Sequence, residues 1–363
     1  MIADTFSFFE SRKGLILGTL HGLPDLSGAR DEGSLKRIVE FCSRGKMIRG
    51  CLVFLGAQAE GLLPASRGPT VERSLPGVAA AMELFQAGLL AHDDIMDRDL
   101  TRRGAPTIHA RYESEAREAG CADAAHLGEA LGICLGDLCY FEAYALLERS
   151  LAGLPRSGEV IGLCSSVLSG VAVAQMSDVA WGAGTREPTE DEILAMYRGK
   201  TARYSFSLPL AAGALVADDP ELASALSALG DELGMLFQIR DDELGLFGSP
   251  GEMGKTVGSD LREGKKTLFR ARLIAAAAKA GKEERERITR AFTPGERDED
   301  ELSSHIDYIR DLARRLGVTA GIAAMSEEAE SKANAILSKL STPSGEARAA
   351  LEGLVEYVTR RDK

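Results

Sequence analysis

The segment from residue 77 to 98 constrains the fold more than any other, because as a helix it has almost no polar face and then turns abruptly acidic. A helix without a polar face is buried by neighbours on most sides. The segment 219–247 has the same character and leads into Asp241 and Asp242. Two core helices whose ends carry paired carboxylates predict a central apolar cavity with a charged mouth.

Helical periodicity continues along almost the whole chain, punctuated by proline and glycine. Strand signals are scarce, and no Asn-Gly hairpin turn is present. We therefore expect an all-α, single-domain helical bundle over residues 1–363, with Pro76 near the first turn of its helix. The expected helices cover residues 33–43, 46–60, 76–98, 125–150, 156–182, 189–198, 201–216, 219–247, 265–281, 298–315, 317–340 and 345–361.

Composition narrows the class of function. The net charge of −12 argues against a nucleic-acid binder, which usually carries a basic stripe. The N-terminus lacks the pattern of a signal peptide and no apolar run approaches roughly 18 residues, so we expect a soluble, cytoplasmic protein without a transmembrane segment. The six cysteines form no C-x-x-C pair, which argues against zinc and favours buried thiols in a reducing compartment.

The first acidic cluster is Asp93, Asp94 and Asp97, followed by Arg102 and Arg103. Asp93 and Asp97 are four residues apart, so a helix projects both carboxylates from one face. Carboxylates this close repel one another unless cations lie between them, and oxygen ligands suit Mg²⁺, which takes further ligands from phosphate oxygens. The alternative is a solvated acidic helix face, which the apolar helix before the cluster and the arginine pair after it disfavour.

Two further clusters are weaker when each is considered alone. Gln238, Asp241 and Asp242 lie where the second apolar helix ends. Lys46 and Arg49 lie three apart at the start of a helix, where backbone N–H groups also favour anions. Ordinary charged helix ends remain the alternative for each cluster, and their combination in one all-helical chain is the more specific signal.

The run Gly254-Lys255-Thr256 imitates a phosphate-binding P-loop. A P-loop needs a glycine five residues earlier, where this chain has Ser249, and it follows a strand rather than a helix. We therefore reject a nucleoside triphosphatase.

Taken together and in this order, these clusters resemble the trans-isoprenyl diphosphate synthases, the family of farnesyl and geranylgeranyl diphosphate synthases. The shared landmarks in this sequence are Gly45-Lys46 with Arg49, Asp93-Asp94 with Asp97, Arg102-Arg103-Gly104, Ala174-Gln175 with Asp178, Lys200-Thr201, Gln238 with Asp241-Asp242, Lys255 and Glu263-Gly264-Lys265. The resemblance covers residues 35–270. It implies the isoprenoid synthase fold and a prenyltransferase that condenses isopentenyl diphosphate head to tail with an allylic diphosphate.

The resemblance also implies a role for each landmark. Asp93 and Asp97 would hold two Mg²⁺ ions and Asp241 a third, with Asp94 and Asp242 as further candidate ligands. The remaining implied contacts are Arg102, Lys200, Lys255 and Lys265 with the allylic diphosphate, Lys46, Arg49, Arg103 and Gln86 with the diphosphate of isopentenyl diphosphate, and Thr201 and Gln238 beside the carbocation. Metal ions and cations stabilise the leaving diphosphate, and a dry apolar cavity protects the carbocation from water.

Product length is implied by the residues just before the first aspartate cluster. Gly88 and Leu89, five and four residues before Asp93, would set the floor of the product cavity, with Phe85 one turn deeper. Because Gly88 has no side chain, we expect a C20 product or a longer one; the alternative for Gly88 is close helix–helix packing. Gly245 replaces the last aspartate of the second motif, which leaves the third metal ion fewer obvious ligands.

Two other functions stay open. A class I terpene cyclase would use similar metals, but it needs no second diphosphate site, and Lys46, Arg49 and Arg103 are present. A non-catalytic partner subunit of a prenyl synthase would tend to lose its aspartates, and here they are retained. The family resemblance further implies a homodimer.

Overall fold

A computed structural model describes residues 2–23, 32–59, 68–184, 186–247, 258, 261, 264–277, 282–293, 298–340 and 345–360. Helices dominate this part of the chain, which confirms the all-α expectation. The helices are α1 (Ile2–His21), α3 (Glu32–Ser43), α4 (Ile48–Gln58), α5 (Pro69–Met96), α6 (Ile108–Glu118), α7 (Ala124–Leu151), α8 (Ser157–Ala183), α9 (Glu190–Tyr197), the π-helix η2 (Arg198–Ser207), α10 (Leu208–Val216), α11 (Pro220–Phe247), α13 (Leu268–Ala277), α14 (Lys282–Ala291), α15 (Glu299–Arg315), α16 (Val318–Lys339) and α17 (Glu346–Thr359).

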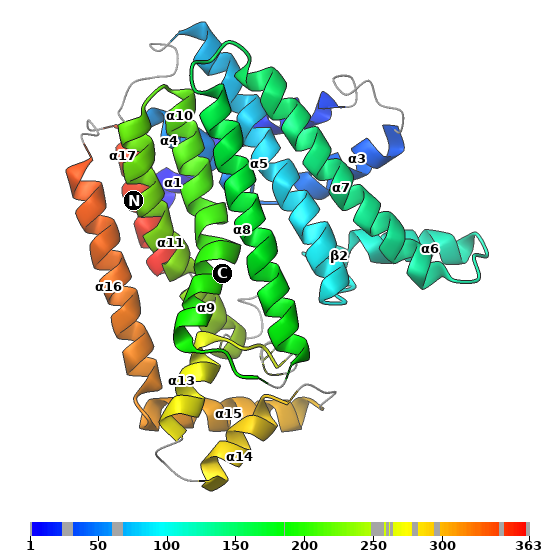
Figure 1. The fold of residues 1–363 in the computed structure, drawn as a ribbon, viewed down its shortest axis with the longest axis vertical. Helices are drawn as coiled ribbons and strands as arrows, with labels where there is room; N and C mark the ends of the chain where they lie inside the picture. The colour runs from blue at the N-terminus through cyan, green and yellow to red at the C-terminus, as the bar shows by residue number, and fades with distance from the viewer. Residues whose placement is uncertain are drawn as a thin grey trace. The chain divides into compact units, whose positions relative to one another are not determined.

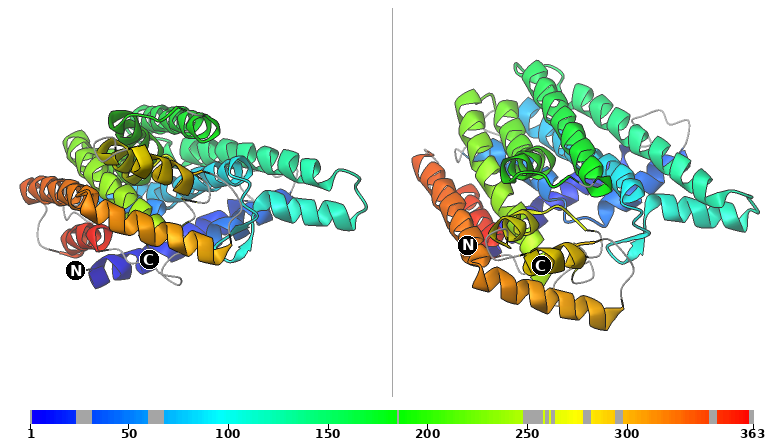
Figure 2. Two further views of the ribbon diagram at one scale, coloured as in Figure 1. Left: turned by 90° about the horizontal axis from the view of Figure 1, so that it is seen from below. Right: turned by 60° about the horizontal axis from the view of Figure 1, so that its bottom comes forward.

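The chain divides into two compact units, each assembled from three separate segments. Unit 1 is Met1–Ser165, Pro209–Leu226 and Ser341–Gly353, and unit 2 is Ser166–Leu208, Ser227–Leu340 and Leu354–Lys363. In unit 1, α5 and α7 run side by side (Figure 1), and α4 packs on α5. In unit 2, α13 and α15 each pack against both α14 and α16 (Figure 2). The expectation of one domain stays a prediction.

Three helices form where none is expected from the sequence, namely α1, α6 and α14. The last two are short and strongly charged, and each buries only a few side chains. Helix α14, for example, buries only Ile288 and Ala291 among its ten residues. So few apolar positions do not produce a readable period, and tertiary packing decides that such segments are helical.

Helix α5 begins earlier than expected. Pro69 occupies its first turn, and Pro76 lies inside the helix rather than near its start. A proline inside a helix removes the hydrogen bond to the carbonyl four residues earlier, here that of Glu72. Glu72 is exposed, so water can satisfy its carbonyl group, and the helix continues to Met96.

Glycines bring α5 and α7 close together. A side chain on Gly77 would overlap Ser150, and one on Gly136 would overlap the ring of His92. Small residues at these positions let two helix backbones approach more closely than larger side chains would allow. Helix α5 lies in the core of unit 1, because nearly all of its side chains between Ser74 and Phe85 are buried.

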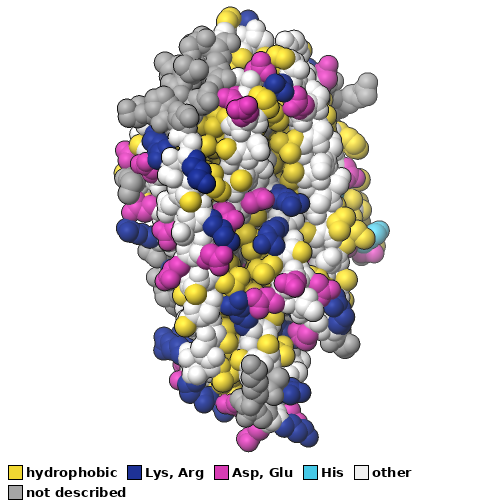
Figure 3. Space-filling model, turned by 60° about the vertical axis from the view of Figure 1, so that its left-hand side comes forward, with side chains coloured by type: hydrophobic (Ala, Val, Ile, Leu, Met, Phe, Trp, Pro, Cys, Tyr) yellow, Lys and Arg dark blue, Asp and Glu magenta, His cyan; other side chains and the backbone are white. Residues whose placement is uncertain are grey.

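Three helices of the described chain, α5, α7 and α8, are long and apolar enough by length and composition to cross a membrane. A count of uninterrupted apolar residues overlooks them, because glycine, serine and a few polar residues interrupt each run. The absence of a transmembrane segment stays a prediction. Figure 3 shows one face of the molecule on which basic and acidic side chains are interspersed.

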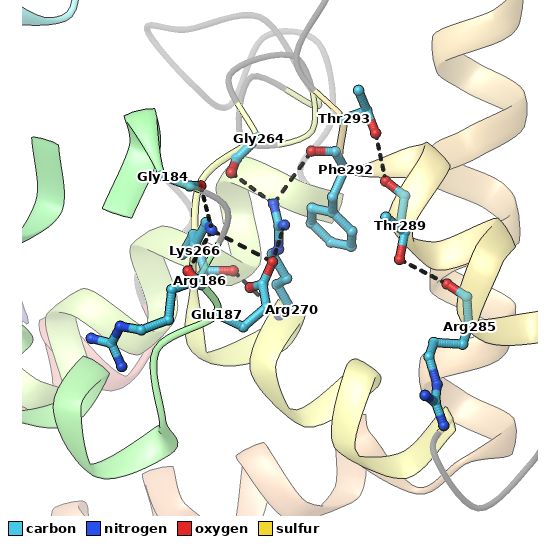
Figure 4. Close-up of polar contacts among 11 residues, drawn as sticks. Gly184, Arg186, Glu187, Gly264, Lys266, Arg270, Arg285, Thr289, Phe292 and Thr293 are labelled. Carbon is cyan, nitrogen blue, oxygen red and sulfur yellow. Dashed lines mark hydrogen bonds and ion pairs between the residues drawn. The ribbon is translucent and has the colours of Figure 1, made fainter. Parts of the chain in front are cut away.

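A buried cationic cluster ties together three segments of unit 2 (Figure 4). Lys266 Nζ donates to the carbonyl oxygens of Gly184, at 3.1 Å, and Arg186, at 2.7 Å. Arg270 Nη1 donates to the carbonyl of Gly264, at 2.8 Å, and its Nη2 donates to Glu187 at 2.5 Å. Lys266 and Arg270 are both buried, so each charge needs these hydrogen bonds to offset the loss of water. The bonds also hold the segment that carries Lys265 against the segment after α8.

Candidate active site

One stripe of α5 is less buried than the rest of the helix. Gln86, Leu89, Leu90 and Asp93 are half-buried and Asp97 is exposed, whereas their neighbours between Leu75 and Ala91 are mostly buried. The spacing of these positions places them on one helix face. The N–H of Asp97 still donates to the carbonyl of Asp93, at 2.8 Å, so the helical geometry extends through both aspartates, as predicted.

Asp94 lies on the other side of the helix end and is fully buried. Its Oδ1 accepts bonds from Arg102 Nε, at 2.6 Å, and from Arg102 Nη2, at 2.5 Å. Burial raises the pKa of Asp94, and the bonds to Arg102 oppose that shift. Among the described residues, Asp94 Oδ2 has no hydrogen-bond partner. Asp94 therefore orients the guanidinium of Arg102 and retains one oxygen for another cation.

A short hairpin that the sequence analysis missed carries the arginine pair. Strands β1 (Thr101–Arg102) and β2 (Ala105–Pro106) pair antiparallel. The two residues between them, Arg103 and Gly104, both have positive φ, of 54° and 72°. Such a loop matches the twist of a two-residue hairpin, and it turns successive arginines to different sides. The Arg103-Gly104 pair was the sequence signal for this turn, since glycine readily adopts the positive φ that the second loop residue requires.

Arg103 lies against the other basic cluster of unit 1. A Cβ added to Gly45 would stand 2.8 Å from Arg103 Nη1, so the absence of a side chain at residue 45 makes room for the guanidinium. Lys46 is exposed, and Met47 takes a left-handed conformation, with φ of 52°, at the start of α4. Arg49 follows in the first turn of α4. The structure thus brings together Arg103 with the Gly45–Arg49 segment, although 54 residues separate Arg49 from Arg103 in the sequence.

In unit 2, the residues of the second motif form a hydrogen-bonded chain. Thr201 Oγ1 donates to Gln238 Oε1 at 2.7 Å, and Gln238 Nε2 donates to Asp242 Oδ1 at 2.8 Å. The hydroxyl of Tyr197 donates to Asp242 Oδ2 and accepts the N–H of Leu268 at 2.9 Å. Both oxygens of Asp242 are therefore engaged, while Asp241, its half-buried neighbour, precedes it on α11. Sequence reasoning missed Tyr197.

Lys200 and Thr201 lie in the π-helix η2, which joins α9 and α10 without a break. The expected boundary between two helices at Gly199 is thus wrong, and a widened helical turn takes its place. Such turns are rare and frequently occur at functional sites. Lys200 Nζ donates to Asp178 Oδ2 at 2.7 Å, so the Ala174-Gln175 motif with Asp178 supplies the partner of the Lys200-Thr201 motif.

The remaining predicted contacts are partly described. Lys265 is half-buried, and its neighbour Lys266 belongs to the buried cluster described above. Lys255 and the tail 361–363 lie outside the described residues. No group of three or more His, Cys, Asp or Glu side chains within the described ranges is placed to hold a metal ion by itself.

Gly88 and Phe85 do not lie on the face of Asp93. A Cβ on Gly88 would stand 2.8 Å from Tyr140 Cε1, and Phe85 packs edge-to-face on Tyr144 with ring centroids 5.0 Å apart. Both residues therefore pack against α7. The inference that Gly88 leaves room is wrong, because the ring of Tyr140 fills that room; close helix packing, the alternative, describes the residue. Leu89 alone of the three lies on the stripe with Asp93.

Comparison with known proteins identifies the family. The polyprenyl synthetase family matches residues 34–309. The chain belongs to the polyprenyl synthetase family. The chain is 32% identical over 365 residues to the geranylgeranyl diphosphate synthase of Sulfolobus acidocaldarius, covering 98% of this chain and 100% of the relative. It is 37% identical over 200 residues to a short chain isoprenyl diphosphate synthase of Methanocaldococcus jannaschii, spanning 55% of that protein.

Solved structures agree with this assignment. The chain resembles a geranylgeranyl pyrophosphate synthase from Corynebacterium glutamicum, solved in complex with isoprenyl diphosphate and magnesium, with a TM-score of 0.84, 28% identity and 98% coverage of both chains. A geranylgeranyl pyrophosphate synthetase from Pyrococcus horikoshii gives a TM-score of 0.79 with 26% identity over 99% of both chains. The chain is therefore a transferase of the prenyltransferase class, as the sequence motifs predict.

Proposed function

We propose that this protein condenses isopentenyl diphosphate with an allylic diphosphate in a Mg²⁺-dependent reaction and releases a polyprenyl diphosphate of C20 or longer. The similarity to a geranylgeranyl diphosphate synthase along the whole chain, rather than Gly88, supports this product length. The observation that carries the proposal is that unit 1 contains both an acidic site and a separate basic site. The stripe of α5 presents Asp93 and Asp97, and a separate basic cluster contains Arg49 and Arg103. An acidic site suits a metal-bound diphosphate, whereas a basic site suits a diphosphate without metal.

The described residues fit the metal that the family uses. Asp93 and Asp97 offer oxygen ligands from one helix face, and Asp94 Oδ2 is a buried oxygen without a partner among the described residues. Bound Mg²⁺ would neutralise the diphosphate as it leaves the allylic carbon. We propose that Asp93, Asp97 and Asp241 hold these ions, three in all, and that the engaged oxygens of Asp242 place Asp241 rather than bind metal.

Side chains of the protein bind the departing diphosphate and stabilise the carbocation. Arg102, held by Asp94, presents its guanidinium to the departing diphosphate. Lys200 carries a second positive charge, fixed by Asp178. The hydroxyl of Thr201 is oriented by Gln238, so its oxygen dipole can face the positive carbon. Leu89 and Leu90, which lie on the α5 stripe with Asp93, supply apolar surface that excludes water from a carbocation.

A product assay tests the proposal. The purified chain is incubated with labelled isopentenyl diphosphate and Mg²⁺, with dimethylallyl, geranyl or farnesyl diphosphate in turn, and dephosphorylated products are sized. Elongation that EDTA and the substitution Asp93→Ala abolish supports the proposal. A folded protein that elongates none of the three starters contradicts it, and cyclisation of a long prenyl diphosphate or activation by a partner subunit would then be tested.

We also propose that the enzyme is a cytoplasmic homodimer. Helix α7 carries apolar side chains at positions 127, 131, 134, 138 and 141, a spacing that alternates four and three. Phe141 on this stripe is 71% exposed. Alternating spacing of this kind is typical of helices that pair with another helix, and one stripe can pair with its own copy about a two-fold axis. Light scattering on the wild type and Phe141→Glu tests the dimer, which the introduced charge should dissociate.

The proposed cytoplasmic location rests on the cysteines. All six are free, which suits a reducing compartment.

A further inference from the structure

Glu83 is a buried acid that the proposed reaction does not use. It is the only charged residue between Leu75 and Ala91 on α5, and only 6% of its surface is exposed. A carboxylate in such a position is costly unless it is hydrogen-bonded or paired. Glu83 Oε1 accepts the N–H of Gly50, in the first turn of α4, at 2.8 Å. The side chain therefore joins the core helix to the start of the helix that carries Arg49.

The charges around Glu83 are those of the basic cluster. Arg49 and Arg103 both act electrostatically on its carboxylate and favour the ionised form, while burial opposes ionisation. Arg103 is the residue for which Gly45 makes room. Two guanidinium groups, from α4 and from the β1–β2 loop, thus lie within electrostatic range of one buried carboxyl group.

The balance of charge is informative. Lys46, Arg49 and Arg103 bring three basic side chains to the cluster, so even an ionised Glu83, with its single negative charge, leaves a positive excess. An excess of cations fixed by hydrogen-bonded geometry is what recognises a diphosphate without metal.

We propose that Glu83 is a positioning residue that holds Arg49 and Arg103 in the arrangement that binds the diphosphate of isopentenyl diphosphate; this inference rests on the proposed function. A glutamate that only capped α4 would need an acceptor oxygen and no charge, so glutamine would replace it without consequence. A glutamate that also orders two guanidinium groups needs its charge. The substitution Glu83→Gln, which keeps size and acceptor oxygen, separates these two roles.

The first experiment measures binding of inorganic pyrophosphate by calorimetry in EDTA, where the aspartate motifs cannot bind it through metal. We expect Glu83→Gln to weaken this binding by about tenfold, the effect of losing a charge-assisted contact. Glu113→Gln, an acid-to-amide change on α6 in the same unit, should bind as the wild type does. Unchanged binding by Glu83→Gln, or tighter binding because a negative charge has been removed, would overturn the proposal.

The second experiment measures KM for each substrate. Glu83→Gln should raise KM for isopentenyl diphosphate by about tenfold and leave KM for the allylic diphosphate within about twofold, because only one diphosphate meets this cluster. An equal rise in both KM values would contradict a positioning role. If Glu83→Gln does not fold, Glu83→Asp, which withdraws the charge by one methylene, replaces it in both experiments with the same expected direction.

Failure of this inference is separable from failure of the proposed function. A wild type that elongates an allylic starter while Glu83→Gln keeps its KM values overturns only the role of Glu83. A wild type that neither elongates nor binds pyrophosphate without metal overturns both.

Discussion

In the interface between α5 and α7, the ring of Tyr140 fills the space that a side chain on Gly88 would occupy. A Cβ on Gly88 would stand 2.8 Å from Tyr140 Cε1 and 2.9 Å from the carbonyl oxygen of Gly136. The ring of Tyr140 in turn packs edge-to-face on His92, with centroids 5.6 Å apart. The position that lacks a side chain on one helix is thus filled by an aromatic side chain from the other, one turn from Asp93.

This relationship predicts that Gly88→Ala destabilises the protein. The added methyl group meets the backbone of α7, which cannot move aside as a flexible side chain can, so we expect a loss of about 1–3 kcal/mol. Gly162→Ala on α8 is the matched control, because nothing lies within 4 Å of its Cβ position; it should be neutral or stabilising by up to about 1 kcal/mol. Urea unfolding of both variants measures the difference, and equal stability of the two would show that α5 and α7 tolerate separation.

Tyr140 should influence product length. Removing its ring in Tyr140→Ala opens space beside Gly88, near Asp93, and we expect the product distribution to shift by one or more isoprene units towards longer chains. The assay is the sizing of dephosphorylated products with farnesyl diphosphate as starter. Tyr112→Ala on α6 controls for loss of a tyrosine elsewhere in unit 1. An unchanged distribution from a folded Tyr140→Ala enzyme would place the limiting residue elsewhere, with Leu89 the next candidate.

Asp93 and Asp94 are adjacent but should respond differently to substitution. Asp94→Ala removes the buried partner of Arg102, and breaking such a pair costs about 3 kcal/mol or more. Asp93→Ala alters a half-buried residue, so it should abolish elongation with a change in stability below about 1 kcal/mol. Thermal unfolding and turnover, measured together, check both statements. Wild-type stability in Asp94→Ala would contradict the role assigned to the pair.

Tyr197 should contribute to stability through its hydroxyl group. Tyr197→Phe deprives Asp242 of a donor and the N–H of Leu268 of its acceptor, in a buried place, and we expect a cost of about 1–3 kcal/mol. Tyr308→Phe on α15 is the control, because the buried Tyr308 hydroxyl has no partner among the described residues; its loss should be neutral or stabilising. Urea unfolding compares the two, and an equal effect in both variants would mean that the bonds of Tyr197 do not matter.

The buried carboxylate of Glu83 predicts a pH dependence of stability. Burial raises its pKa above the ordinary value of 4.5. The folded state therefore binds this proton more tightly than the unfolded state, so stability contributed by the protonated group is present below pH 4.5 and is lost as pH rises towards the folded pKa. Glu83→Gln lacks this loss.

The measurement is the melting temperature of the wild type and Glu83→Gln from pH 4.5 to 8. The wild type should lose stability relative to the variant as pH rises. Arginine guanidinium groups keep their charge in proteins, and burial raises the pKa of the thiols of Cys42 and Cys51, which therefore stay neutral in this window. A constant difference across this range would show that the carboxylate keeps an ordinary pKa.

The order of the motifs was readable from the sequence because it depends on local chemistry. Paired aspartates after an apolar helix, an arginine pair after them and a second acidic helix end are one-dimensional patterns, and they predicted both the helical class and the family. The long helices α7, α8 and α11 were predicted to within about two residues for the same reason, since their period is continuous.

Helices with few apolar residues, the Arg103-Gly104 hairpin and the π-helix at Lys200 were not predicted. Each depends on what the segment packs against rather than on its own residues. Glu83 did leave a signal, a lone acid in an apolar helix, but its partners are Gly50, Arg49 and Arg103, which come from distant parts of the sequence.

The sequence by itself therefore determined which residues can carry the chemistry, because charge, size and helical period are properties of the residues. Only the tertiary structure decided which face each residue takes. Leu89 lies with Asp93, whereas Gly88, its neighbour, lies under Tyr140. Adjacent residues on a helix point about 100° apart, and the packing of α7 against α5 selects which of them is covered.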